Sequence, residues 1–165
     1  MPPSLLLALQ HPNVQAFLHT IRRCEGTDYP DGYHFVFGSR EDNTLRNTDL
    51  SCHPGTKYAA HYRDHTGHDI ITTAAGAYQF IHSTWQALQA QLSLPDFSPA
   101  SQDLAAAALL SEKNCLQPLL QGDLNKALQQ AAAIWASLPA SLAHQPVKTL
   151  AQARQYYEEN GGSLA

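Results

Sequence analysis

The chain has 165 residues and a net charge of −4 with histidine neutral, and only 15% of its residues are charged. This length suits a single domain with its own core. The negative balance argues against a nucleic-acid partner, because duplex binding depends on clustered lysine and arginine. The apolar run at residues 4–9 lacks the basic flank of a signal peptide, and no stretch approaches the roughly 20 apolar residues that span a bilayer. We therefore expect synthesis in a cytoplasm without stable membrane insertion.

The first clear helix pattern precedes Glu25. Its apolar residues follow the spacing of one helical face, namely Val14, Phe17, Leu18, Ile21 and Cys24. Asn13 is the expected N-cap and Gly26 lies just past the end. Glu25 therefore lies at a helix C-terminus, where the helix dipole disfavours a carboxylate.

Residues 27–74 are rich in Gly, Asp, Asn, Thr, His and aromatic residues. The alternating aromatics of residues 33–38 predict a strand, and residues 45–50 and 69–73 are weaker candidates. Tyr33 and Phe35 would share a strand face and could form either core or a platform for a sugar. We expect a small antiparallel sheet that forms one lip of a cleft.

The remainder reads as helices over residues 78–92, 99–113, from 124 toward Pro139, and 149–158. Ser98 before Pro99 is a helix start, as is Gly122-Asp123. We therefore predict an α+β fold, in one domain over residues 1–165. Its helical lobe would comprise residues 13–26 and 75–162, beside a β-rich lobe of residues 27–74.

Cysteine and histidine offer alternative chemistry. The three cysteines favour a reducing compartment, with one disulfide plus a free thiol as the alternative. Cys52, His53, His61, His65 and His68 gather in one segment, but they match no catalytic zinc signature. A polar surface loop is the preferred interpretation, so we expect no metal and no cofactor.

Glu25 is the strongest candidate for catalysis. By position alone it would be a solvated carboxylate. Its setting suggests more, since the apolar face of a helix leads to it and then breaks at Gly26. Cleavage of a glycosidic bond needs an acid that its surroundings keep neutral. A glutamate at the floor of a cleft meets that need.

The chain also resembles the lambda-phage type of endolysin, a lytic transglycosylase family, over roughly residues 13–162. The blocks that carry the resemblance occur in the family's order: Ala16-Phe17-Leu18, Glu25-Gly26-Thr27-Asp28, Gly32-Tyr33, Val36 and Gly38, Thr48-Asp49, His53-Pro54, Thr73, Ala75-Gly76, Tyr78-Gln79, Asp96-Phe97-Ser98-Pro99-Ala100-Ser101-Gln102-Asp103, Gly122-Asp123 and Ile134-Trp135-Ala136-Ser137-Leu138-Pro139. Many short blocks in order are far more specific than any one of them. The resemblance implies a lysozyme-like fold.

The same resemblance implies that Glu25 is the single catalytic acid and base. It implies that Tyr78 and Gln79 line the cleft, and that residues 135–139 end a helix near the same site. Gly76, Tyr33 and Ser137 complete the candidate substrate-binding set. The sequence departs from the family pattern at Ala77, where the family has arginine, and after Pro139, where Gly and Tyr are absent.

One carboxylate suffices for a lytic transglycosylase. His34 and Arg40 stand where T4-type lysozymes carry Asp and Thr after the catalytic Glu. In a transglycosylase the C6 hydroxyl of N-acetylmuramic acid attacks its own C1, so proximity replaces a second group. The product is a 1,6-anhydro end. A hydrolytic muramidase, a non-catalytic wall-binding derivative and a metal-dependent amidase built on the histidine segment are the alternatives.

The expected partner is therefore peptidoglycan, degraded by a phage or prophage endolysin. Such an enzyme accumulates in the host bacterial cytoplasm and acts on the periplasmic wall after release. Release requires a separate membrane-permeabilising protein of the holin type. We expect the enzyme to be a monomer.

Overall fold

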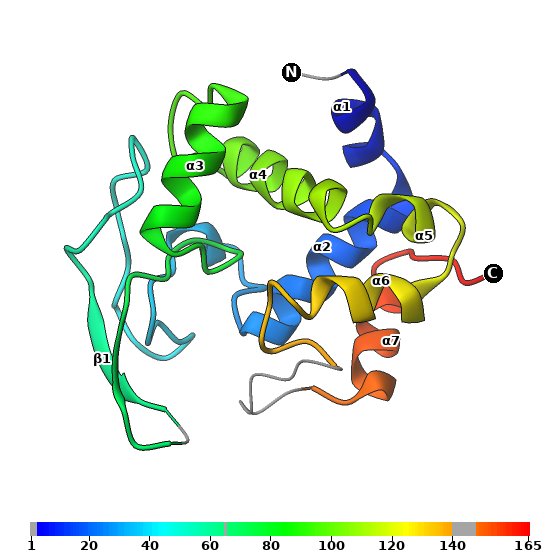
Figure 1. Cartoon of the computed structure of the whole chain (residues 1–165). Helices are drawn as coiled ribbons and strands as arrows, with labels where there is room; N and C mark the ends of the chain where they lie inside the picture. The colour runs from blue at the N-terminus through cyan, green and yellow to red at the C-terminus, as the bar shows by residue number, and fades with distance from the viewer. Residues whose placement is uncertain (1–2, 65, 140–147) are drawn as a thin grey trace. The chain divides into compact units, whose positions relative to one another are not determined.

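The structure is a computed structural model that describes residues 3–64, 66–139 and 148–165. In these ranges the chain forms seven α-helices, one 3-10 turn and one two-stranded sheet. The elements are α1 (Pro3–Leu9), α2 (Pro12–Glu25), η1 (Gly32–His34), β1 (Ala60–Arg63), β2 (Asp69–Thr72), α3 (His82–Leu92), α4 (Pro99–Glu112), α5 (Leu116–Leu120), α6 (Leu124–Ala131) and α7 (Leu150–Glu159) (Figure 1). The predicted α+β class is confirmed.

The chain divides into two compact units. The first contains Met1–Glu25 and Ala106–Ala165, and the second contains Gly26–Ala105. The expected β-rich lobe ended at residue 74, whereas the second unit continues through α3 and the first half of α4. Among the described residues, no helix combines the length and the apolar character that crossing a bilayer requires.

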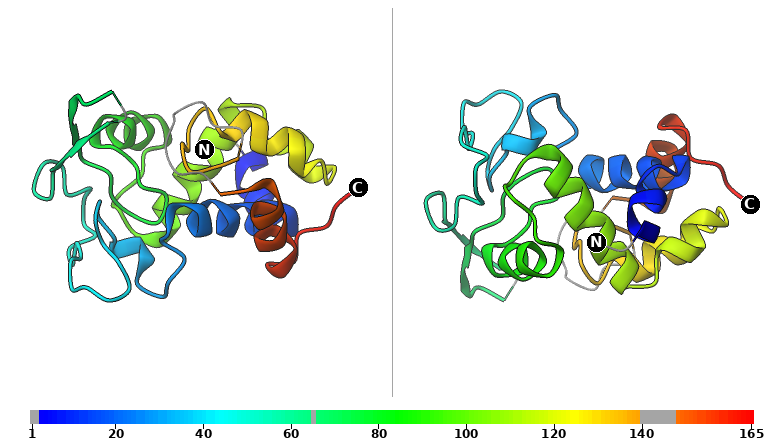
Figure 2. Two further views of the ribbon diagram at one scale, coloured as in Figure 1. Left: turned by 90° about the horizontal axis from the view of Figure 1, so that it is seen from below. Right: turned by 90° about the horizontal axis from the view of Figure 1, so that it is seen from above.

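Helix α2 is the centre of the first unit. Its predicted apolar face is buried, and Phe17 and Ile21 have no exposed surface. α7 packs against it, and the two helices lie side by side in Figures 1 and 2. α5 packs against it as well. The 3.6-residue periodicity therefore identified both the helix and its buried face.

The predicted N-cap of α2 is wrong. The helix begins at Pro12, and the side chain of His11 accepts a hydrogen bond from the Asn13 amide at 3.2 Å. Asn13 itself is buried, and its side chain donates to the Leu119 carbonyl at 2.9 Å and accepts from the Ser163 amide at 2.8 Å. The Asn13 side chain therefore bonds to backbone groups that are distant in sequence and does not cap α2.

The predicted C-terminal helices are largely confirmed. The Asp123 side chain caps α6 by accepting from the Lys126 amide, and Thr149 and Gln152 form a capping box on α7. α6 ends at Ala131 and does not run on toward Pro139, so residues 132–139 form turns. The short helix α5 was not predicted.

The β prediction is partly wrong. The sheet is a hairpin in which β1 and β2 pair antiparallel, with Ala60 opposite Thr72. β2 matches the expected strand at residues 69–73, but β1 was not predicted. Residues 33–38 instead form η1 and a single bridge between Val36 and Ala75. Residues 45–50 have no strand structure. Alternating side chains occur here without the backbone partner that a strand requires.

Helix α3 begins four residues later than predicted, at His82. Tyr78 lies in a turn before it, closed by two hydrogen bonds between Ala75 and Phe80. Trp85 and Phe97 pack edge to face behind that turn, with ring centroids 4.5 Å apart. The aromatic core of the second unit therefore supports the segment that joins the hairpin to α3.

Candidate functional site

Glu25 is the last residue of α2. Gly26 follows with φ +73°, a left-handed conformation that ends the helix and that glycine adopts without a steric penalty. The chain thus turns away directly after the carboxylate. The C-terminal position also places Glu25 where the helix dipole disfavours negative charge.

Ser137 lies beside Glu25 in the first unit. The Ser137 hydroxyl donates a hydrogen bond of 2.5 Å to Glu25 Oε1. The Ser137 carbonyl in turn accepts from the Lys148 amide at 3.1 Å, which holds the segment in place. The two residues are 112 positions apart in sequence, so the fold creates this pair.

Burial raises the pKa of the Glu25 carboxyl group, and the hydrogen bond from Ser137 opposes the rise. The residue as a whole stays partly exposed. A carboxyl group that is desolvated and still accessible is suited to general acid catalysis, because it keeps its proton closer to neutral pH. Glu25 therefore has the electrostatic character that the sequence suggested.

Cys24, the neighbour of Glu25, is unsuited to nucleophilic chemistry. Its burial raises the pKa of the thiol to about 12, with the Glu25 charge adding to the effect and the Lys148 charge opposing it. The thiolate is the reactive form of cysteine. Cys24 thus acts in packing, as its position on the buried face of α2 predicted.

Two tyrosines share one carboxylate in the second unit. The Tyr33 hydroxyl donates to Asp103 Oδ1 at 2.8 Å, and the Tyr78 hydroxyl donates to the same oxygen at 2.6 Å. Tyr78 is only 1% exposed, so its ring is packed inside the second unit and offers no face to a sugar. Tyr33 is only partly buried. Of the two tyrosines, Tyr33 is the one that keeps access to solvent.

Gly76 and Gln79 lie in the turn between Ala75 and Phe80. Gly76 has φ +80°, and a Cβ atom there would overlap the side chain of Gln102. Gln79 has φ +50°, which few residues other than glycine adopt. Its side-chain amide donates to the Gly76 carbonyl at 2.9 Å and stays partly exposed. Gly76 is therefore needed for close packing, whereas Gln79 presents a polar group.

Gln102 organises the same turn from α4. It is fully buried, and its Oε1 accepts from the Ala77 amide at 2.8 Å. Its Nε2 donates to the carbonyls of Tyr33 and Phe97 at 3.1 and 2.8 Å. No individual role was predicted for Gln102 or Asp103 from the sequence. A polar pair inside an alanine-rich helix was the signal that could have identified them.

The histidines separate in the structure. His53 is buried, whereas His61 on β1 and His68 near the hairpin tip are exposed. His65 lies outside the described residues. Over the ranges that the structure describes, no three His, Cys, Asp or Glu side chains come together to hold a metal ion.

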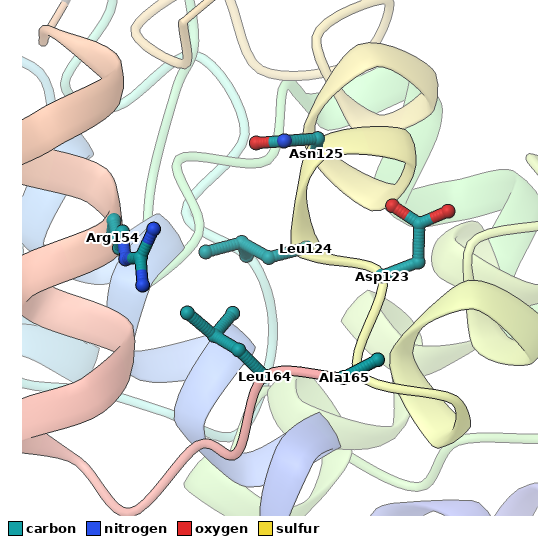
Figure 3. Close-up of a pocket in the computed structure, with 7 residues that line it drawn as sticks. Asp123, Leu124, Asn125, Arg154, Leu164 and Ala165 are labelled. Atoms are coloured by element: carbon teal, nitrogen blue, oxygen red, sulfur yellow. The ribbon is translucent and has the colours of Figure 1, made fainter.

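A cavity of about 340 Å³ opens elsewhere in the first unit. Leu124 and Leu164 line it, and Arg154 points toward them from α7 (Figure 3). Neither Glu25 nor Ser137 lines this cavity, so the acid chemistry does not belong to it.

The structure therefore brings the predicted site residues together in two groups. Glu25 and Ser137 form one within the first unit. The second unit holds the other group, formed by Tyr33, Gly76, Tyr78 and Gln79 around the side chains of Gln102 and Asp103.

The chain matches known proteins over nearly its whole length. The family model for endolysin matches residues 15–164. The endolysin of Escherichia phage P2 is 34% identical over 139 residues, which are 79% of this chain and 82% of that protein. The endolysin of Escherichia phage lambda is 33% identical over 133 residues, 77% of each chain.

Solved structures show the same relationship. The bacteriophage lambda lysozyme complexed with a chitohexasaccharide aligns with a TM-score of 0.83 and 30% identity, over 94% of this chain and 97% of that one. A second structure of the lysozyme from bacteriophage lambda aligns with a TM-score of 0.76 and 29% identity over the same shares. The predicted lysozyme-like fold is confirmed. This chain belongs to the endolysin family, as a cell wall lytic enzyme of the lambda lysozyme type.

Proposed function

We propose that this enzyme is a peptidoglycan lytic transglycosylase that uses Glu25 first as general acid and then as general base. The observation that carries the proposal is the desolvated Glu25 carboxyl group, whose pKa is raised by burial and which accepts a hydrogen bond from Ser137. An acid of this kind can give its proton to the bridging oxygen of a glycosidic bond near neutral pH.

The proposed reaction needs no water. Glu25 transfers its proton to the oxygen that leaves C1 of N-acetylmuramic acid, and the C1–O bond breaks. The C6 hydroxyl of the same sugar bonds to C1 and gives its proton to the Glu25 carboxylate. The acid is thereby restored, and the new chain end is a 1,6-anhydro sugar. Because the nucleophile is part of the substrate, a second catalytic carboxylate is not needed.

Ser137 supports both steps. Its hydroxyl donates to Glu25 Oε1, which fixes the rotamer of the carboxyl group and stabilises the carboxylate after the first proton transfer. The same bond limits how far burial raises the pKa of Glu25. A group that serves as acid and then as base works best when neither form is strongly favoured.

For sugar contacts we propose Gln79 and Tyr33. The Gln79 amide can donate and accept at once, as hydroxyl and acetamido groups of a sugar require. The chitohexasaccharide bound in the complex of the bacteriophage lambda lysozyme is a glycan of the same general class. Gly76 and Tyr78 would act by shaping the turn that carries Gln79.

Partners and location follow from the proposed role. As an endolysin the enzyme would accumulate in the host cytoplasm, reach the periplasmic wall through a holin-type protein and act as a monomer. A wild-type gene expressed without a holin would then leave cells intact until the inner membrane is permeabilised.

The products of digestion test the reaction. Purified peptidoglycan digested by the wild-type enzyme should yield muropeptides that are lighter by one water than hydrolysis products, without new reducing ends. Glu25→Gln should yield none while staying folded by circular dichroism. New reducing ends in proportion to cleavage would identify a hydrolytic muramidase instead, and an active Glu25→Gln variant would remove Glu25 from the mechanism.

A further inference from the structure

A buried histidine lies behind the turn that carries Gln79. His53 is 6% exposed. Its ring stacks on His82 with centroids 5.2 Å apart, and the Phe97 ring meets it edge to face at 4.9 Å. Trp85 closes the same cluster at 6.4 Å. The two ring nitrogens of His53 form hydrogen bonds with the backbone.

Two hydrogen bonds assign the tautomer of His53. Nε2 lies 2.9 Å from the Phe80 carbonyl oxygen, which can only accept, so Nε2 carries the proton. Nδ1 lies 3.0 Å from the Gly55 amide nitrogen, which donates, so Nδ1 has no proton. The ring is therefore neutral. A second proton on Nδ1 would face the N–H group of Gly55 and break that bond.

The Phe80 carbonyl directly follows the left-handed residue Gln79. It accepts from the Ala75 amide at 3.0 Å as well as from His53. The backbone N–H group of Gln79 donates to the Gly76 carbonyl at 3.1 Å. An uncommon backbone conformation persists only where the surroundings hold it. The side chains of His53 and Gln102 both bond to the backbone of this turn.

We propose that His53 is a positioning residue that, in its neutral form, fixes the Ala75–Phe80 turn. It thereby holds the side-chain amide of Gln79 in place for sugar binding. The proposal rests on the proposed function of this enzyme, since it takes Gln79 as a sugar contact. His53 itself touches no substrate. It acts through its hydrogen bonds to the backbone of Gly55 and Phe80.

The stabilisation of the turn by His53 should weaken as the pH falls. Burial lowers the pKa of His53, the neighbouring His82 lowers it further, and the bond to the Phe80 carbonyl opposes both. A histidine with a lowered pKa in the folded state takes up its proton more readily in the unfolded chain. Its contribution to stability is therefore complete above its ordinary pKa of 6.5 and is lost as the pH falls below that value.

The groups that the structure shows in contact with His53 include one other titratable side chain. Trp85 and Phe97 are uncharged, and the contacts with Gly55 and Phe80 are to the backbone. In the described part of the chain, His82 is the titratable side chain stacked on His53. A His82→Gln variant therefore separates its charge from that of His53.

Three variants test the proposal. His53→Leu removes both hydrogen bonds, whereas His53→Gln keeps an N–H donor near Phe80 and cannot titrate. His61→Gln is the matched control, because His61 is exposed on β1. With His53→Leu we expect KM for peptidoglycan fragments to rise about 2- to 10-fold, the size of one lost hydrogen bond, and kcat to change less than KM. His53→Gln should restore much of KM. It should also remove the rise in KM that we expect of the wild-type enzyme as the pH falls through the lowered pKa of His53.

Two measurements without substrate accompany the kinetics. Nitrogen NMR of histidine-labelled wild-type enzyme should show His53 neutral at about pH 7 with its proton on Nε2. Amide exchange at Gly55, Gln79 and Phe80 should be faster in His53→Leu than in His61→Gln. A charged ring, a proton on Nδ1, or equal exchange in the two variants would overturn the proposal.

The outcomes separate this proposal from the proposed function. An active Glu25→Gln variant would refute the mechanism, while the tautomer and the exchange rates of His53 would stand. If Glu25→Gln is inactive and His53→Leu leaves KM at the value of His61→Gln on both sides of neutrality, the mechanism stands and the positioning role of His53 is refuted.

Discussion

Replacing Glu25 with glutamine should stabilise the protein at neutral pH while it removes the activity. Burial raises the pKa of Glu25, which means that the fold disfavours the ionised carboxylate. At neutral pH the wild-type protein bears a cost in either form, because it must bury the charge or keep a proton that the unfolded chain releases. Glutamine has nearly the same shape, has no charge, and can still accept the hydrogen bond from Ser137.

The size of the gain follows from two opposing contributions. Desolvation of an ionised carboxylate costs several kcal/mol, and one hydrogen bond to a charged group returns about 1.5–3 kcal/mol. Because the pKa is raised despite that bond, desolvation is the larger. With partial exposure of the residue, we expect a net gain of about 1–2 kcal/mol. For a chain of this length that corresponds to about 2–8 °C in Tm.

The sign of the pH dependence identifies the cause. A carboxyl group with a raised folded pKa contributes stability that is complete below its ordinary value of 4.5 and is lost as the pH rises through the folded value. The difference between Glu25→Gln and wild type should therefore vanish near pH 4 and be largest above neutrality.

Thermal and urea unfolding from about pH 4 to 8 would measure this difference. Glu41→Gln is the control, because Glu41 is an exposed carboxylate, and it should change Tm by less than about 1 °C at every pH, as surface substitutions do. The reasoning is refuted if Glu25→Gln is no more stable than wild type at neutral pH, or if its gain persists at the acid end of the range.

Two further substitutions test the site and its support. Ser137→Ala removes the bond that lowers the pKa of Glu25, so the basic limb of kcat/KM should move to higher pH and kcat should fall about tenfold. Gly76→Ala forces a left-handed φ on alanine and drives its methyl group into Gln102. It should cost about 2–4 kcal/mol in urea unfolding.

Each substitution has a matched control. Ser111→Ala alters an exposed serine on α4 and should leave the pH profile unchanged. Gly67→Ala has a similar φ of +86° but open space around the new methyl group, so it should cost clearly less than Gly76→Ala. A basic limb that stays in place in Ser137→Ala, or equal costs at the two glycines, would contradict the structural account.

Local chemistry made much of the helical structure predictable. The buried face of α2, the Asp123 cap of α6 and the capping box of α7 each depend on residues a few positions apart. Neighbours in sequence are neighbours on a helix, so periodicity and capping report them directly. The position of Glu25 at the end of α2 followed from the same signals.

Strands were harder, because a strand depends on a partner that the local pattern does not contain. Residues 33–38 alternate as a strand would, but in the described ranges they form one isolated bridge, between Val36 and Ala75. β1 forms instead in the histidine-rich segment, where pairing with β2 decides the structure. Register and pairing are tertiary properties.

The sequence by itself determined the family, most of the longer helices and the identity of the candidate acid. Only the tertiary structure decided the state of that acid, since Ser137 reaches Glu25 from 112 positions away and burial raises the pKa of the carboxyl group. It likewise turned Tyr78 inward to Asp103. Desolvation and long-range hydrogen bonds depend on which distant groups meet in space, and that information appears only when the chain is folded.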